Sequence, residues 1–279
     1  MARENFAAVM VEIHKFEGGF TKDSRDPGNW TGGKVGSGKL LGTNMGIAAN
    51  TYPKEDIPNL TKERAGELYR RDFWNPIRGD DLPAGVDYAT MDGSVNSGKK
   101  RGVQWLQRAV GLTGTAADGS VGPKTLDAVA TRHRASGSVK VVKDMCAIRM
   151  GFLRGLKTFT TFGKGWSRRV ANVEAVGVKM AMLTSASPGT VREVLIGESE
   201  KAKITASKET QKGGTTAVAG GGAVGSEASG VTDLTGLPEW AWIVVGVIVV
   251  IIAIRFIGNA KHDKDRAEAY EAAAVTTKP

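Results

Sequence analysis

The chain has 279 residues, a net charge of +9, and 41% hydrophobic and 24% charged residues. This balance is that of an ordinary globular protein with one sizeable core or two small ones. The positive charge favours polyanionic partners such as an acidic cell wall or anionic lipid, but scattered Lys and Arg residues without a long basic run argue against nucleic acid. The single cysteine, Cys146, excludes an intramolecular disulfide, and its helical spacing predicts a buried core residue rather than a catalytic thiol.

Apolar residues at helical spacing run through the first 183 residues and predict a mainly α fold. Gly18 and Gly19 end the first predicted helix, Thr61 is a predicted N-cap, and Pro123 is expected in a first turn. The only predicted strands form a short hairpin in the Gly-rich stretch 21–47. The helical stretches are 5–17, 60–74, 101–111, 122–133, 139–156 and 166–182.

The last third of the chain changes character twice. Residues 184–236 are rich in glycine and poor in large apolar groups, which predicts a flexible linker. Residues 237–257 form an apolar run with Trp240 and Trp242 near its start, which predicts one transmembrane helix. Lys and Arg residues concentrate after this run, so the positive-inside rule places the charged tail 258–279 in the cytoplasm and the globular part on the other side. The N-terminus does not have the pattern of a signal peptide.

Two carboxyl groups stand out near the first helix. Met10, Ile13 and Glu17 share a helical face, which places Glu17 at the edge of the apolar core, where partial burial favours the protonated form that a general acid requires. Asp26 follows nine residues later in a polar Asp-Pro-Gly turn. One protonated and one ionised carboxyl is the arrangement that cleaves glycosidic bonds. The alternative is a solvated helix terminus followed by a common turn. The three histidines are far apart in sequence, so no metal site is predicted.

Several linked motifs resemble glycoside hydrolase family 108 muramidases. "FEGGF", "DPG" and "TNMGIAANTYP" correspond to the family patterns EGGY, DPGG and TNYGIT. Later stretches resemble the Val-Asn-Ser-Gly element and the predicted peptidoglycan-binding region that usually follows, so the likeness covers about residues 5–182. It implies a lysozyme-like helical domain over 1–97 and a peptidoglycan-binding-like region over 98–183. It also implies hydrolysis of the β-1,4 bond between N-acetylmuramic acid and N-acetylglucosamine.

The resemblance maps the family's catalytic glutamate onto Glu17. The nine-residue interval to Asp26 is similar to that of phage-type lysozymes, whose Thr-x-x-Gly-Ile element resembles residues 43–47. Asp26 is therefore the candidate second carboxylate, as a nucleophile, a water-positioning group or a loop brace. Phe20 and Met45 depart from the family pattern, and the loop between Asp26 and Thr43 is longer.

Six other residues are candidates for sugar binding: Thr43, Asn44, Trp74, Tyr88, Asp92 and Asn96. The polar groups among them can hydrogen-bond acetamido or hydroxyl groups. Trp74 and Tyr88 are candidates for stacking on sugar rings, although aromatic residues at helical spacing are also typical of a core.

These observations together predict a membrane-anchored phage endolysin that needs no cofactor. Its expected partners are peptidoglycan and the host inner membrane, with a holin as a further candidate, and the catalytic domain is expected to face the cell wall. Two alternatives remain at this stage. One is a holin-like membrane-disrupting protein with a non-catalytic wall-binding domain, and the other is a virion-associated wall-penetration muramidase.

Overall fold

A computed structural model describes residues 5–221 and 239–278, without the side chains of 213–221, 239–250 and 253–255. The chain divides into two compact units. The first comprises Met1–Phe159 with Met180–Ser185, and the second comprises Thr160–Lys179 with Ala186–Pro279.

The first unit is mainly helical, as the sequence predicts. Thr61 caps its second helix by accepting a hydrogen bond from the Arg64 backbone N–H at 3.1 Å, and Pro123 begins its last long helix. That last helix is kinked at Gly137, whose φ of 74° lies outside the helical region. The helices are α1 (Asn5–His14), α2 (Lys62–Tyr69), α3 (Val86–Ser97), α4 (Lys99–Ala109) and α5 (Pro123–Arg154). Short turns complete the chain path: η2 (Pro27–Asn29), η3 (Arg70–Trp74), η4 (Gly79–Asp81) and η5 (Gly114–Ala116).

The core of this unit is built around α3, which is buried continuously from Val86 to Ser94. A helix that is buried on all sides lacks an amphipathic stripe, because neighbours pack around its whole circumference. Helix α4 crosses it closely at Gly102, where an added Cβ would lie 2.3 Å from the Ser94 hydroxyl oxygen. Glycine at this position therefore allows the two helices to pack against each other.

The predicted hairpin is present and short. Strands β1 (Thr43–Asn44) and β2 (Ile47–Ala48) pair antiparallel, with Thr43 opposite Ala48 and Asn44 opposite Ile47. The two turn residues, Met45 and Gly46, have φ values of 49° and 76°, the left-handed conformation of a tight hairpin turn. Thr21 adds an isolated bridge to Thr43, which joins the hairpin to the chain that follows α1.

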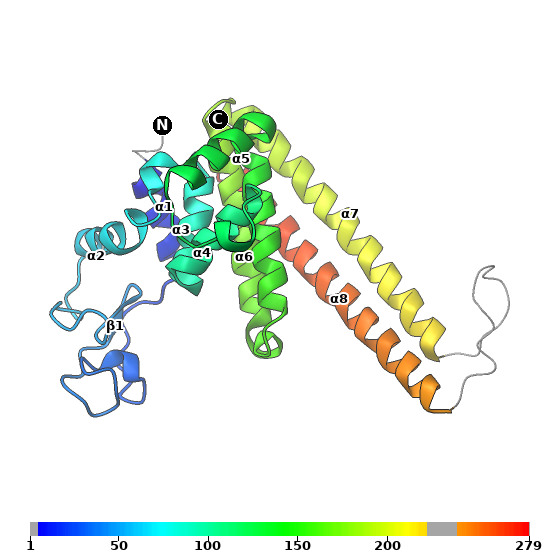
Figure 1. Cartoon of the computed structure of the whole chain (residues 1–279), viewed down its shortest axis with the longest axis horizontal. Helices are drawn as coiled ribbons and strands as arrows, with labels where there is room; N and C mark the ends of the chain where they lie inside the picture. The colour runs from blue at the N-terminus through cyan, green and yellow to red at the C-terminus, as the bar shows by residue number, and fades with distance from the viewer. Residues whose placement is uncertain (1–4, 222–238, 279) are drawn as a thin grey trace. The chain divides into compact units, whose positions relative to one another are not determined.

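The second unit consists of long helices. They are α6 (Phe159–Leu183), of which residues 160–179 belong here, α7 (Pro188–Gly221) and α8 (Glu239–Val275). Figure 1 shows α7 and α8 as two long helices that lie side by side. Ser199 on α7 donates to the Ala267 carbonyl on α8 at 3.0 Å, and Asn259 faces Glu209 at 3.5 Å, so the two helices run antiparallel.

The structure differs from the linker predicted for 184–236, because residues 188–221 are helical. The buried positions Val191, Leu195, Ala202 and Ala206 recur every four or seven residues and form a narrow apolar stripe. Two of these side chains are alanines, so the stripe adds little to the mean hydropathy of the segment. The polar and glycine-rich composition therefore predicts a linker although the segment is helical. Residues 222–238 of the predicted linker lie outside the described residues.

The predicted charged tail 258–279 is also a packed element over much of its length. Tyr270 is fully buried and donates to Glu174 on α6 at 2.8 Å, while Arg266 donates to the same carboxylate at 2.7 Å. Arg266 of the tail therefore packs against α6 through Glu174. The hydrophobic periodicity of the tail alone cannot predict this contact, because it depends on another helix.

The predicted transmembrane segment 237–257 is described in part, with residues 239–257 forming the first part of α8. Residues 237 and 238 are not described, and neither are the side chains of 239–250 and 253–255. Within the described part of the chain, no helix combines the length and the apolar character needed to cross a bilayer.

Candidate active site

Glu17 lies in a turn after the first helix and not on the helix itself. Helix α1 ends at His14, and the next residues form tight turns in which Lys15 N–H donates to the Glu12 carbonyl and Phe16 N–H to the Ile13 carbonyl. The sequence predicts that Glu17 shares a helical face with Met10 and Ile13, and this is wrong. The helix ends at His14, one turn earlier than Gly18 and Gly19 predict, so Glu17 lies beyond it. Ile13 is fully buried and fixes the position of this turn.

The Glu17 carboxyl contacts the hairpin at Gly46. A Cβ on Gly46 would lie 2.7 Å from Glu17 Oε2 and 2.3 Å from the Tyr69 hydroxyl oxygen, so both groups already occupy the space beside this glycine. Tyr69, at the end of α2, is buried and donates its hydroxyl to the Met45 carbonyl at 3.1 Å. Gly46 is exposed and Glu17 is half-buried. The carboxyl is thus held at a surface that a large substrate can approach.

His14 is a neighbour of this site that motif reasoning missed. Its ring meets the Tyr69 ring edge-on with centroids 6.0 Å apart. Burial lowers the pKa of His14, the Lys62 cation lowers it further, and the Glu17 carboxylate opposes both. Its buried Nδ1 has no hydrogen-bond partner in the described part of the chain. The available signal was its position three residues before Glu17, which brings both side chains to the same end of α1.

Asp26 has a bracing role in this structure. Its carboxylate accepts a hydrogen bond from the Gly28 N–H at 2.8 Å and caps the short turn η2. The same loop is tied to the hairpin by buried Asn29, which accepts from the Thr43 hydroxyl at 2.7 Å and donates to the Asp23 carbonyl at 3.0 Å. Asp23 is paired with Arg25, whose hydrogen bonds lower the pKa of that carboxyl to about 2. Of the three roles considered for Asp26, these contacts favour the loop brace.

Comparisons with known proteins show the family to which the chain belongs. Residues 10–98 match the family described as glycosyl hydrolase 108, and residues 101–171 match a predicted peptidoglycan domain. The chain is similar to SagA of Brucella abortus, a solved structure, with 38% sequence identity and a TM-score of 0.52 over 64% of this chain and 97% of that one. The chain belongs to glycosyl hydrolase family 108. No curated protein matches it. The protein is therefore a glycoside hydrolase, and its second domain indicates peptidoglycan as the polymer on which it acts.

Thr43 and Asn44 lie on β1 of the family 108 domain, next to the turn that Glu17 contacts. The Thr43 hydroxyl is engaged with Asn29, and the Asn44 amide donates to the Ile57 carbonyl at 3.1 Å. Both side chains therefore hold the hairpin in place, and they are half-buried.

The proposed stacking roles of Trp74 and Tyr88 are wrong in this structure. Both side chains are fully buried, so neither ring has a face for a sugar. Trp74 packs edge-on against Phe6 with centroids 5.3 Å apart and donates its indole N–H to Asp80 at 2.9 Å. The core alternative holds because Tyr88 belongs to the buried helix α3 and Trp74 lies in η3, which packs against that helix.

Asp92 and Asn96 also have structural roles instead of lining a sugar site. Asp92 is fully buried and pairs with Arg149 on α5 at 2.5 Å, while Asn96 accepts from the same guanidinium at 3.0 Å. Arg149 is itself 3% exposed. These residues connect the hydrolase segment to the peptidoglycan-domain segment through one buried guanidinium.

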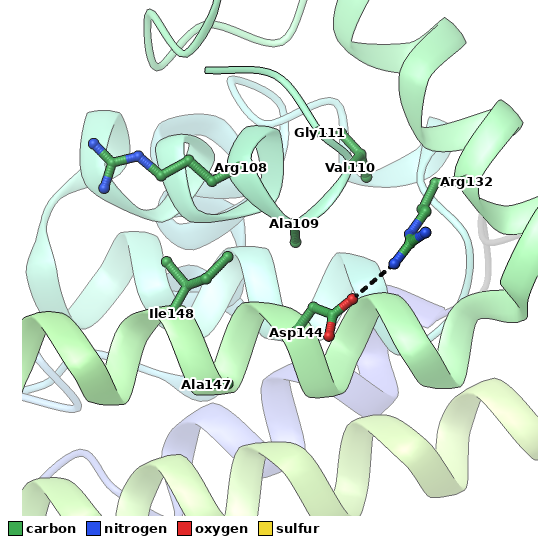
Figure 2. A pocket seen from close by; sticks show the side chains of 8 residues that line it. All are labelled: Arg108, Ala109, Val110, Gly111, Arg132, Asp144, Ala147 and Ile148. Atoms are coloured by element: carbon green, nitrogen blue, oxygen red, sulfur yellow. Dashed lines mark hydrogen bonds and ion pairs between the residues drawn. The ribbon is translucent and has the colours of Figure 1, made fainter. Parts of the chain in front are cut away.

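A cavity of about 410 Å³ lies at the kink of α5, and none of the predicted site residues lines it. Figure 2 shows Arg132 and Asp144 facing each other across it, and they form an ion pair at 3.1 Å. Lys140 pairs with the same carboxylate. The Asp144 carboxylate therefore pairs with the positive charges on this wall of the cavity. Its pair with Arg132 joins the two parts of α5 on either side of the kink at Gly137.

Proposed function

We propose that the protein is a muramidase that hydrolyses the β-1,4 bond between N-acetylmuramic acid and N-acetylglucosamine in peptidoglycan. The supporting observation is the position of Glu17, whose carboxyl meets the exposed Gly46 of a short hairpin beside the Tyr69 hydroxyl. The site has no side chain at Gly46, so a bulky polymer can come close to the carboxyl.

Glu17 is the general acid in this proposal. It gives its proton to the glycosidic oxygen as the bond to the anomeric carbon breaks, and the sugar that keeps the anomeric carbon becomes oxocarbenium-like. A water molecule then adds its hydroxyl to that carbon, and its remaining proton restores the Glu17 carboxyl, directly or through solvent. The hydrogen bond from the Tyr69 hydroxyl to the Met45 backbone carbonyl holds the hairpin turn beside Glu17. The distance between the acid and the substrate is therefore set by rigid elements. Asp26 supports this arrangement by fixing the loop before the hairpin.

The test uses the full chain and its Glu17→Gln variant on purified peptidoglycan, with new reducing ends identified by mass spectrometry. The wild type should release N-acetylmuramic acid reducing ends, and the variant should lose at least about 100-fold of this activity, as expected for loss of a general acid. Glu67→Gln is the matched control, because Glu67 is an exposed carboxylate paired only at the surface with Arg64. Full activity of Glu17→Gln would contradict the proposal.

We further propose that this activity serves host cell lysis as a membrane-anchored phage endolysin. The support is the apolar run 237–257, flanked on its C-terminal side by cations, which suits an anchor in the inner membrane with the hydrolase facing the cell wall and the C-terminus in the cytoplasm. A holin is the partner class that such a lysis system would use. The tail contacts of Arg266 and Tyr270 with Glu174 on α6 must open for the tail to cross to the cytoplasmic side.

A further inference from the structure

A second and larger cavity, of about 800 Å³, lies where the two family segments meet. Pro76 and Ile77 contribute one side from the hydrolase segment, and residues 118–121 contribute another from the peptidoglycan domain. The start of α4 forms the remaining wall with Lys99, Lys100 and Arg101. We call this cavity the junction groove. A ligand in the junction groove would touch both parts of the enzyme.

The junction groove carries an excess of positive charge, although the Asp118 carboxylate interacts electrostatically with Lys100. Its lining includes three consecutive cations and one acid, Asp118. The Asp118 carboxylate is held within its own loop by Gln107 and by the Ser120 N–H, both at 2.8 Å. Among the described residues, neither Lys99 nor Lys100 forms an ion pair, and both are exposed. This contrasts with the cavity of Figure 2, where Asp144 pairs with two cations.

The three cations do not stabilise α4 through its helix dipole. All three lie in the first turn of α4, which contains no acidic residue, and the positive end of the helix dipole repels cations there. Arg101 gains a contact with the Phe152 ring at 4.4 Å, whereas the Lys99 ammonium is 6.0 Å from the Phe73 ring. The chain therefore keeps mutually repelling charges at a place where they favour a bound anion.

We propose that the junction groove binds the carboxylate-bearing stem peptide of peptidoglycan, with Lys99 and Lys100 as its main charge contacts. This inference rests on the proposed action on peptidoglycan. The repeating sugars of the strand are uncharged where a peptide is attached, so the free carboxylates of the polymer lie in its peptides. Ser97, Gln104 and Ser120 line the same groove and supply hydrogen-bonding groups for peptide amides. Binding of the peptide would hold the strand on both domains while the hydrolase acts.

The test measures binding separately from catalysis. Full-length Glu17→Gln protein is mixed on ice with sacculi freed of phosphate polymers, either intact or with their peptide carboxylates converted to neutral amides by carbodiimide and ethanolamine, and the bound fraction is measured by sedimentation. Adding Lys99→Gln and Lys100→Gln should weaken binding to intact sacculi about fivefold to tenfold, the range for two partly exposed charge contacts. It should leave binding to amidated sacculi at the level of the parent protein. Salt should weaken only the peptide-dependent part.

The matched control is Arg108→Gln with Arg134→Gln, which removes the same charge from exposed positions outside the junction groove. An equal loss in this control, or equal binding of the parent to intact and amidated sacculi, would overturn the proposal. Competition gives a readout that needs no variant: a free acidic stem tripeptide should release the parent protein from intact sacculi, and a neutral tripeptide should not. Failure of the tripeptide to compete would also overturn it. Failure of the muramidase proposal would appear elsewhere, as activity that survives Glu17→Gln.

Discussion

At the scale of single residues, Gly46 is a position beside Glu17 where only glycine fits without displacement of its neighbours. Its φ of 76° favours glycine, and a Cβ there would collide with Tyr69 and Glu17. Gly46→Ala should therefore displace the Glu17 carboxyl and lower kcat by at least about tenfold, since small misplacements of a catalytic group are costly. Gly36→Ala is the control, because Gly36 has a φ of 78° and open space around it. Both variants should lose about 1 kcal/mol of folding stability from the left-handed backbone, measured by thermal unfolding. An equal effect on kcat in both would refute a specific role for Gly46.

Asp87, also at the residue scale, should make stability depend on pH. It is fully buried, and burial raises the pKa of its carboxyl from 3.8 to about 6 despite hydrogen bonds from Asn5 and the Tyr88 N–H. The folded state thus keeps a proton that the unfolded state has lost. This contribution is complete below the unfolded pKa and is lost as the pH rises through about 6. Asp87→Asn should therefore gain up to about 3 kcal/mol relative to wild type between about pH 4 and about pH 7. Urea unfolding across this range measures the difference, and a flat difference would contradict it.

At the scale of elements, the pair of Arg149 on α5 and Asp92 on α3 should dominate the docking of these helices. Both side chains are almost completely buried, so removing one leaves the other charge without its partner in the core. Arg149→Met should lower the free energy of unfolding by about 3–5 kcal/mol, and the double variant with Asp92→Asn should recover part of that loss. Arg132→Met is the control on the same helix, because its pair with Asp144 is partly exposed and should contribute at most about 1 kcal/mol. Equal losses for Arg149→Met and Arg132→Met would contradict this account.

The same scale shows what sequence patterns could predict. Local chemistry predicts helix starts well: Thr61 caps α2 and Pro123 begins α5 because each acts on its own backbone. The hairpin around Gly46 was predictable for the same reason. Burial at Trp74 and Asp92 was not, because it depends on which elements surround α3. Tyr69 reaches Glu17 only through the packing of the end of α2 against α1 and the hairpin, and the sole sequence signal for His14 was its position three residues before Glu17. Motif matching therefore predicted Glu17 without its neighbours.

At the scale of the whole molecule, α8 combines an apolar segment suited to a membrane anchor with a tail that packs against other helices. The two features favour different positions of the tail. Residues 237–257 have the composition of an anchor, but residues 258–275 continue α8 and pack against α6 and α7. A single-pass anchor would carry this tail across the bilayer and break its contacts with Glu174. Membrane insertion with a cytoplasmic C-terminus and docking of the tail on α6 are therefore mutually exclusive states.

Weakening the docked state should shift this balance toward insertion. Glu174 is 4% exposed and accepts hydrogen bonds from Arg266 and Tyr270, so Glu174→Ala removes the α6 partner of both side chains and should open the tail. Arg266 then keeps only its pair with Asp263 on its own helix. In spheroplasts, a C-terminal epitope should then be shielded from added protease in a larger fraction of molecules than in wild type. Glu200→Ala is the control, because this exposed carboxylate pairs only with Lys203 at the surface. If the shielded fraction is the same in wild type and both variants, the tail contacts do not oppose insertion, and docking and anchoring must be independent.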